Sequence, residues 1–194
     1  FATDFVREHY LVLSMVEEQT FALDPYYGLH VDIFQNPPEA PVQGAHHGAN
    51  PGISMVAAVP YAVASPMVNF VTRWELARRP AADSTVRYDD PRPRRVAFYH
   101  EIRARGLDIK FGLLSAVTQA FAMAPLTAWS AVAMLETLAV LGLGAPRALG
   151  GAAVYAFGTP VFFRAAYLNQ NLAIAIFAFA AFLLLWNPGR RTRP

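Results

Sequence analysis

The sequence predicts an all-α, polytopic helical membrane protein with a large, α-rich loop outside the cytoplasm. Two observations lead to this prediction. Only 15% of the 194 residues are charged, whereas soluble domains carry about 25%. The charges are also unevenly placed, since residues 1–110 hold 24 of the 30 Asp, Glu, Lys and Arg side chains and all five His. A chain divided in this way is typical of a protein whose front part meets water and whose back part meets lipid.

The back part of the chain contains three long apolar segments that predict transmembrane helices. Residues 111–135 contain no charged side chain, and a helix needs about 20 residues to cross a bilayer. We therefore place the first span at 111–141. The second apolar segment covers 148–163. The third covers 165–186 and ends in a Trp, as expected at a membrane interface.

The front part, residues 1–110, is predicted to be a loop domain with interfacial helices. Residues 1–23 carry apolar side chains at helical spacing, whereas Pro and Gly break up 24–52. Residues 53–72 are uncharged but contain two prolines, which favours a helix that lies at the interface or half-enters the membrane. A full span is the alternative. After a polar, Arg-rich stretch, residues 96–110 are expected to form an amphipathic helix before the membrane.

The positions of the arginines predict which side of the membrane each end of these spans faces. The tail contains Arg190, Arg191 and Arg193, so the positive-inside rule predicts that it is cytoplasmic. Counting back through three spans places the 1–110 region outside, and its own arginines do not contradict this because long loops translocate largely regardless of charge. The chain begins at Phe1 without a signal-peptide pattern, so we expect a fragment that lacks at least one earlier span.

Composition excludes several classes of function. The chain has no Cys, so it forms neither disulfides nor thiolate metal sites. Its formal charge of +2 is too small to indicate nucleic-acid binding. No P-loop, dinucleotide fingerprint or Ser/His/Asp order is present. Two classes remain, a membrane-surface enzyme and a non-catalytic membrane protein such as a transporter piece or an assembly partner. A transporter predicts charges deep within spans, which the late segments almost lack.

The first candidate cluster lies in the predicted 1–23 helix. Asp4 and Glu8 are four residues apart and therefore share a helix face, with Arg7 beside them and His9 next in sequence. A carboxylate held next to a cation is a candidate general base. The alternative is a charged helix surface with an ordinary ion pair, and spacing alone favours that alternative.

A second cluster lies in the Pro- and Gly-rich loop and contains His30, Asp32, His46 and His47. Two His and a carboxylate are metal-ligand types. Their spacing fits no compact ligand motif, however, and adjacent His residues do not direct both rings at one ion. We therefore predict no metal or other cofactor, and assign these His residues to substrate binding or to exposed loop positions.

Two further features point to anion binding and to the membrane boundary. Asn50 begins a turn with Pro51 and Gly52 that opens the 53–72 segment, and a helix start offers free N–H groups to a phosphate. An ordinary turn is the alternative. Arg164 and the polar residues around Gln170 lie at a predicted span end, where they either contact substrate or reach to the interface.

Three stretches resemble a known family. Residues 50–63 resemble the Pro-Gly-x-Ser-Leu-Leu-Ala-x-Pro-x-Tyr segment of bacterial GT-C superfamily membrane glycosyltransferases, near the protein-mannosyltransferase and aminoarabinose-transferase type. Residues 157–164 resemble the Gly-Thr-Pro turn between two later spans of that group, and residues 167–185 resemble the span that follows. The order and spacing of the three stretches agree with the family as well.

The resemblance implies an enzyme of the cell envelope that transfers a glycosyl group from a polyprenyl-phosphate sugar to an acceptor at the outer face of a bacterial inner membrane. It implies a catalytic acid after the missing first span, and Asp4 matches by placement, with Asp32 as second choice and Glu8 as a further candidate. Arg7 or Arg164 would hold the lipid phosphate.

The chain departs from the family pattern at two places. A Tyr-Tyr-x-x-Lys-x-Pro-Gly run often precedes the Pro-Gly turn of the family, whereas here residues 46–52 contain no Lys. A His that often begins the later span is Gln170 here. Both departures concern the phosphate-binding roles that the resemblance implies. The candidate substrate contacts of this chain are Arg7, His46, His47, Asn50, Arg164 and Gln170.

Overall fold

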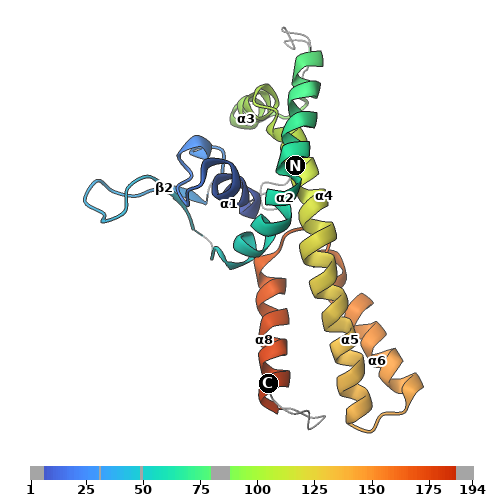
Figure 1. Cartoon of the computed structure of the whole chain (residues 1–194). Helices are drawn as coiled ribbons and strands as arrows, with labels where there is room; N and C mark the ends of the chain where they lie inside the picture. The colour runs from blue at the N-terminus through green and yellow to red at the C-terminus, as the bar shows by residue number, and fades with distance from the viewer. Residues whose placement is uncertain (1–6, 31, 49, 80–87, 187–194) are drawn as a thin grey trace. The chain divides into compact units, whose positions relative to one another are not determined.

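The computed structural model describes residues 7–30, 32–48, 50–79 and 88–186 (Figure 1). The described chain is mostly helical, which confirms the helical part of the predicted fold class. Two compact units divide it, Phe1–Val117 and Thr118–Pro194.

The first unit begins with α1 (Arg7–Leu13), which continues into the π-helical turn η2 (Ser14–Glu18). The expected helix over 1–23 is wrong at its end, because Gln19 adopts a left-handed conformation (φ 53°) that a helix cannot contain. The chain then turns back, and the Ser14 hydroxyl donates a hydrogen bond to the Ala22 carbonyl at 2.5 Å. Glu8 to Leu13 are all buried, so α1 is a core helix of this unit.

A small hairpin follows in the segment expected to be loop. After the 3₁₀ turn η3 (Asp24–Tyr26), strand β1 (Ile33–Gln35) pairs antiparallel with β2 (Ala45–His47). The Asp24 carboxylate anchors β2 by accepting the Ala45 N–H at 2.9 Å. Strands of three residues are too short to show an alternating pattern, which explains why the sequence did not predict them.

Helix α2 (Gly52–Arg78) is one continuous helix of 27 residues, although Pro60 and Pro66 lie within it. It extends beyond the expected 53–72 segment and is long and apolar enough to cross a membrane, by length and composition. One side of the helix packs inside the unit. The other side exposes seven large apolar side chains: Met55, Val56, Val59, Val63, Met67, Phe70 and Trp74.

The amphipathic helix expected over 96–110 is wrong, because the segment contains two helices. Helix α3 (Pro93–Ala104) ends before Gly106, whose φ of 66° lies in the left-handed region, and α4 (Leu107–Thr118) follows. Gly106 also passes close to α2, since a Cβ there would lie 2.9 Å from both Leu76 Cδ1 and Thr72 Cγ2. Only glycine combines this conformation with this close approach.

Helix α4 continues through the π-helical segment η5 (Gln119–Met123) into α5 (Ala124–Val140). Together they form a 34-residue helix, Leu107–Val140, that contains the uncharged residues 111–135 and is long and apolar enough to cross a membrane. Pro125 lies two residues after the end of the π-helical segment. Proline lacks an N–H and its ring clashes with the carbonyl four residues earlier, and a wider turn relieves this clash.

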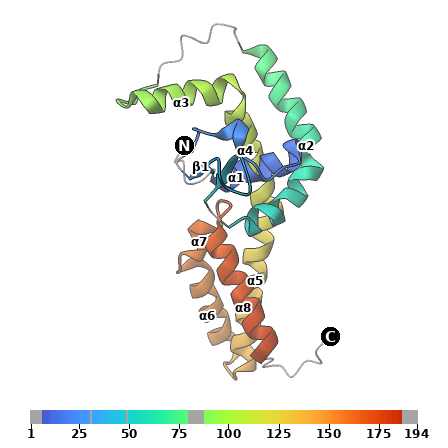
Figure 2. The same ribbon diagram turned by 90° about the vertical axis from the view of Figure 1, so that its left-hand side faces the viewer.

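In the second unit, α5 packs against α6 (Ala145–Phe157) and α8 (Gln170–Trp186), and the short α7 (Val161–Arg164) connects the last two (Figure 2). Gly151 allows a close contact between α6 and α5, because a Cβ there would lie 2.7 Å from Leu138 Cδ1. The segments predicted as spans at 148–163 and 165–186 thus form helices of 13 and 17 residues, shorter than the expected segments. That they cross a membrane stays a prediction.

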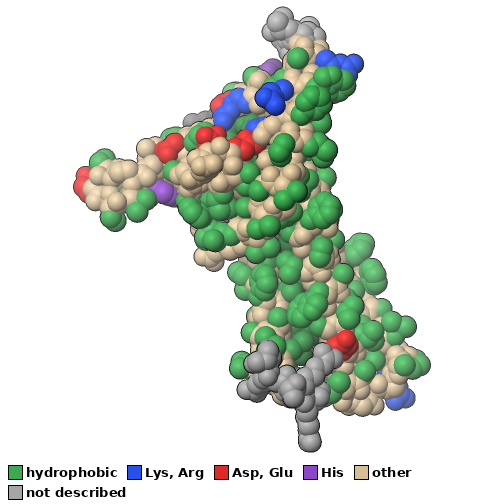
Figure 3. Space-filling model, viewed as in Figure 1, with side chains coloured by type: hydrophobic (Ala, Val, Ile, Leu, Met, Phe, Trp, Pro, Cys, Tyr) green, Lys and Arg blue, Asp and Glu red, His purple; other side chains and the backbone are tan. Residues whose placement is uncertain are grey.

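Hydrophobic side chains cover much of the face shown in Figure 3. Val63 on α2 is 83% exposed, and Phe121 in the Leu107–Val140 helix is 70% exposed. Soluble monomers rarely expose contiguous apolar patches of more than a few hundred Å². The two long helices therefore differ from core helices of soluble proteins, which bury most of their apolar side chains.

The Gly106 junction generates the first prediction. Gly106→Ala should lower the free energy of unfolding by at least about 1–2 kcal/mol, because it forces a left-handed alanine against Thr72 and Leu76. Gly112→Ala is the matched control, since Gly112 lies within α4 and a Cβ there would meet no other atom within 4 Å. It should leave stability unchanged or raise it by up to about 1 kcal/mol. Denaturant unfolding of both purified variants checks this, and equal effects would contradict it.

Asp90 generates a prediction about pH. Hydrogen bonds from the Arg92 side chain, and then from its N–H, lower the pKa of Asp90 to about 2. Because this folded-state pKa lies below the ordinary value of about 3.9, the contact stabilises the start of α3 above about pH 4 and is lost as pH falls toward 2. Carboxyl NMR of ¹³C-labelled Asp should show this titration. Arg92→Gln should move it upward, and an unchanged titration in that variant would contradict the assignment.

Candidate functional site

The structure brings three of the predicted site residues together at the start of α1. The Arg7 guanidinium donates to Glu8 Oε1 at 2.8 Å and to Asp32 Oδ2 at 3.3 Å. Arg7 thus links the first candidate cluster, which contains Glu8, to the second, which contains Asp32. The sequence pattern had predicted them as two separate clusters. The hydrogen bond to Glu8 is the main reason that the pKa of Arg7 is raised above its ordinary value. We call this group the Arg7 cluster.

Glu8 is the buried member of the Arg7 cluster. The whole residue is only 2% exposed, and its carboxylate takes its one described hydrogen bond from Arg7. Neither Glu8 Oε2 nor Arg7 Nε has a hydrogen-bond partner among the described residues. Buried polar groups in proteins are usually hydrogen-bonded. The cluster therefore retains capacity for one further donor and one further acceptor.

Asp32 is the accessible member. Its side chain is 35% exposed, compared with 3% for Glu8, and its contact with Arg7 is longer. The backbone around it is held by two hydrogen bonds, since the Asp32 N–H donates to His30 Nδ1 at 3.0 Å and the Asp32 carbonyl accepts the Gly48 N–H at 2.9 Å. The first bond requires an unprotonated Nδ1 on the buried His30. Asp32 is thus a positioned carboxylate that an external group can reach.

Aromatic side chains surround the buried side of α1. The Tyr10 ring lies 5.4 Å from that of Tyr26 and 5.1 Å from that of Phe111, measured between centroids. Burial raises the pKa of Tyr10 well above its ordinary value, so its hydroxyl stays protonated. His9, also fully buried, lies with Nε2 3.3 Å from the Ser115 hydroxyl. These contacts hold α1 against α4 and thereby hold the Arg7 cluster in place.

A second ionic contact links three segments of the first unit. Glu17 accepts a hydrogen bond from the Tyr61 hydroxyl at 2.7 Å and forms a short ion pair with Lys110. The sequence did not predict this contact, because Tyr61 and Lys110 lie 44 and 93 residues away from Glu17. A signal was present in the composition, since Lys110 is the chain's single lysine and precedes the uncharged residues 111–135.

The remaining predicted residues of the first unit lie outside the Arg7 cluster or outside the described residues. His46 and His47 are half-buried on β2, paired in register with Phe34 and Ile33. Asn50 is exposed in the turn before α2, whose start at Gly52 agrees with the predicted helix opening. Asp4, the first-choice catalytic acid, lies outside the described residues.

Arg164 and Gln170 belong to the second unit. Arg164 ends α7 and is half-buried, and Gln170 begins α8. Gln170 Oε1 is buried without a hydrogen-bond partner among the described residues, whereas the neighbouring Asn169 caps α8 by accepting the Leu172 N–H at 2.9 Å. Both residues thus belong to a different unit from the Arg7 cluster.

Across residues 7–30, 32–48, 50–79 and 88–186, no three His, Asp or Glu side chains lie close enough together to hold a metal ion. Comparison with protein-family models, with curated proteins and with solved structures finds no match to this chain. The resemblance to membrane glycosyltransferases thus stays a prediction from the sequence.

The burial of Glu8 generates a prediction about stability. Arg7→Met should lower the free energy of unfolding by about 3–5 kcal/mol, because it leaves a buried carboxylate without its partner. Adding Glu8→Gln to that variant should recover part of the loss, because the remaining buried group is neutral. A double-mutant cycle measured by denaturant unfolding gives the coupling. Asp32→Asn is the control and should cost much less, since Asp32 is partly exposed. Additive effects of the Arg7 and Glu8 changes would contradict the assignment.

Proposed function

We propose that this chain is part of an integral membrane enzyme that transfers a glycosyl group from a polyprenyl-phosphate-linked sugar to an acceptor at the outer membrane face. The observation that carries the proposal is the Arg7 cluster, in which an accessible carboxylate, Asp32, lies beside a cation. The resemblance of residues 50–63 and 157–164 to membrane glycosyltransferases supports the same reaction class.

The membrane part of the proposal rests on length, composition and exposure. Among the described residues, two helices are long and apolar enough to cross a bilayer, α2 and Leu107–Val140. Their exposed apolar side chains would be covered by lipid. We place the protein in a bacterial inner membrane with residues 1–110 outside the cytoplasm, because the Arg-rich tail fits the cytoplasmic side. In this arrangement α2 lies at the interface or half-enters the membrane rather than crossing it, and Leu107–Val140 crosses.

Asp32 is our candidate general base. It would take the proton from an acceptor hydroxyl while that oxygen bonds to the anomeric carbon of the sugar. The bond between this carbon and the phosphate oxygen breaks, and the polyprenyl phosphate leaves with the electron pair. Glu8 fits this role less well, because it is buried and its carboxylate forms an ion pair with Arg7 at 2.8 Å. Asp4 remains the alternative base.

Arg7 has two roles in this proposal. It orients Asp32, and its guanidinium offers donors to the departing phosphate. Arg164 is the other candidate for a phosphate contact, and His46, His47, Asn50 and Gln170 remain candidates for contacts with sugar or acceptor.

Radiolabelled polyprenyl-phosphate sugars test the function. The full-length protein, purified in lipid, should transfer or slowly hydrolyse the sugar. Asp32→Asn should reduce the rate by about 10²–10⁴-fold, the usual contribution of a general base. Asp4→Asn is assayed in parallel and should retain activity if Asp32 is the base. Glu39→Gln removes an exposed carboxylate between β1 and β2 and should have no effect.

Two outcomes would change the proposal. Loss of activity in Asp4→Asn alone would move the base to Asp4 and leave the reaction class intact. A well-folded protein that neither turns over nor binds any such lipid would contradict the enzyme. The alternative would then hold, that of a non-catalytic polytopic protein in which the Arg7 cluster is purely structural.

A further inference from the structure

We propose that a cationic groove between the carboxyl-terminal half of α2 and the start of α4 binds the phosphate of an anionic phospholipid. The groove has a volume of about 510 Å³. Helix α2 contributes Asn69, Thr72 and Arg73, and the α3–α4 junction contributes Arg105 and Lys110. This binding site is separate from the Arg7 cluster, and the proposal does not depend on glycosyl transfer.

The groove carries more positive than negative charge. Three of its seven lining residues are cationic, and none is acidic. Arg73 is exposed and makes no ion pair with a described residue. Among the described residues, Arg105 pairs with the exposed Glu101 at 3.4 Å and its guanidinium lies 5.5 Å from the centre of the Tyr26 ring, whereas Lys110 pairs with Glu17. Arg73 is thus the charge that remains available for an anion.

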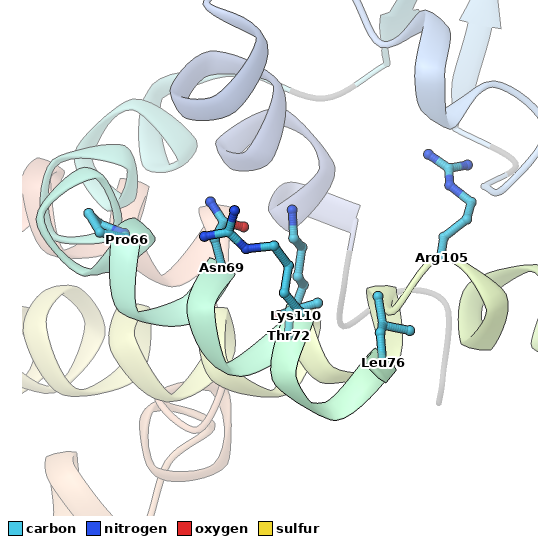
Figure 4. Close-up of a pocket in the computed structure, with 7 residues that line it drawn as sticks. Pro66, Asn69, Thr72, Leu76, Arg105 and Lys110 are labelled. Carbon is cyan, nitrogen blue, oxygen red and sulfur yellow. The ribbon is translucent and has the colours of Figure 1, made fainter. Parts of the chain in front are cut away.

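The polar side chains of the groove converge from two segments of the chain. In Figure 4, Asn69 of α2, Lys110 of α4 and Arg105 of the α3–α4 junction point in the same direction, and Arg105 is set apart from the other two. The close contact of Gly106 with Thr72 and Leu76 brings the α3–α4 junction against α2. A phosphate group accepts several hydrogen bonds at once, and amide, ammonium and guanidinium donors all suit it.

The position of the groove along both helices argues for a lipid phosphate. Residues 53–72 contain no charged side chain, and Arg73 is the first charge after them. Residues 111–135 also contain none, and Lys110 is the last charge before them. Both residues line the same groove. The groove therefore lies where two uncharged helical stretches end, which is the expected depth of phospholipid headgroups.

Apolar surface next to the groove fits the acyl chains of such a lipid. Val63 and Phe70 on α2 are 83% and 64% exposed, and each lies about one helical turn from the groove residue Pro66. A soluble phosphate would gain nothing from these side chains. An anionic phospholipid would bury them while its phosphate meets Arg73.

Fluorescence quenching by brominated lipids tests the groove, because Trp74 follows Arg73 directly. Trp129→Phe and Trp186→Phe leave Trp74 as the single Trp of the full chain. In bilayers, brominated phosphatidylglycerol should bind near Trp74 several-fold more tightly than brominated phosphatidylcholine, and salt should weaken the preference. Arg73→Gln should bring the ratio of the two affinities close to one, and Arg73→Lys should keep most of it. Arg147→Gln, an exposed arginine outside the groove, is the control and should change nothing.

Three results would overturn the proposal. Equal quenching by both lipids in the unchanged groove would show that it does not select anionic headgroups. Loss of the preference on adding inorganic phosphate at constant ionic strength would identify a soluble anion as the ligand. Loss of the preference at low polyprenyl phosphate would assign the groove to the donor lipid instead. Circular dichroism and thermal unfolding of each variant separate these results from misfolding.

Discussion

The buried charge of Glu8 constrains the structure of the first unit more than any other interaction. An ionised carboxylate that is 2% exposed costs several kcal/mol unless a cation compensates it. Arg7 supplies that cation, and the same guanidinium reaches Asp32 in the segment between α1 and the hairpin. The guanidinium that neutralises Glu8 thus also links α1 to Asp32. The Ser54 hydroxyl adds a tie to α2 by donating to the Glu8 carbonyl at 3.1 Å.

The sequence predicted well those features that depend on a run of neighbouring residues. The uncharged residues 111–135 lie in one long helix, and the Asn50 turn opens α2 as expected. The sequence-based prediction was wrong where the backbone conformation of one residue ends a helix within an otherwise helical pattern. Gln19 ends the first helix and Gly106 divides the last helix of the front part, both through left-handed backbone conformations that no periodicity reveals. The hairpin was missed because its strands are too short to carry a pattern.

The candidate site residues show the same difference between contacts of neighbouring residues, which were predicted, and contacts of distant residues, which were not. The pair of Arg7 and Glu8 was predicted because the residues are adjacent, whereas the contact between Arg7 and Asp32 spans 25 residues and could not be read from spacing. Glu17 and Lys110 meet across 93 residues. Such contacts depend on how helices pack, and packing follows from apolar faces that a single sequence defines only loosely. Ion pairs between residues that are far apart in the sequence are therefore the part of the site that only the structure identifies.

The two acidic residues of the Arg7 cluster, Glu8 and Asp32, differ in burial, and this difference decides which carboxylate an external group can reach. Two carboxylates that share one guanidinium compete for it, and the buried one has the stronger claim because it has no water to replace the cation. Glu8 accordingly holds Arg7 at 2.8 Å, and Asp32 is left with a contact of 3.3 Å and a side chain that is 35% exposed. A general base must be ionised, held in place and reachable at once. Burial of Glu8 thus leaves Asp32 as the carboxylate of the cluster that is both held in place and reachable, as the proposed general base would have to be.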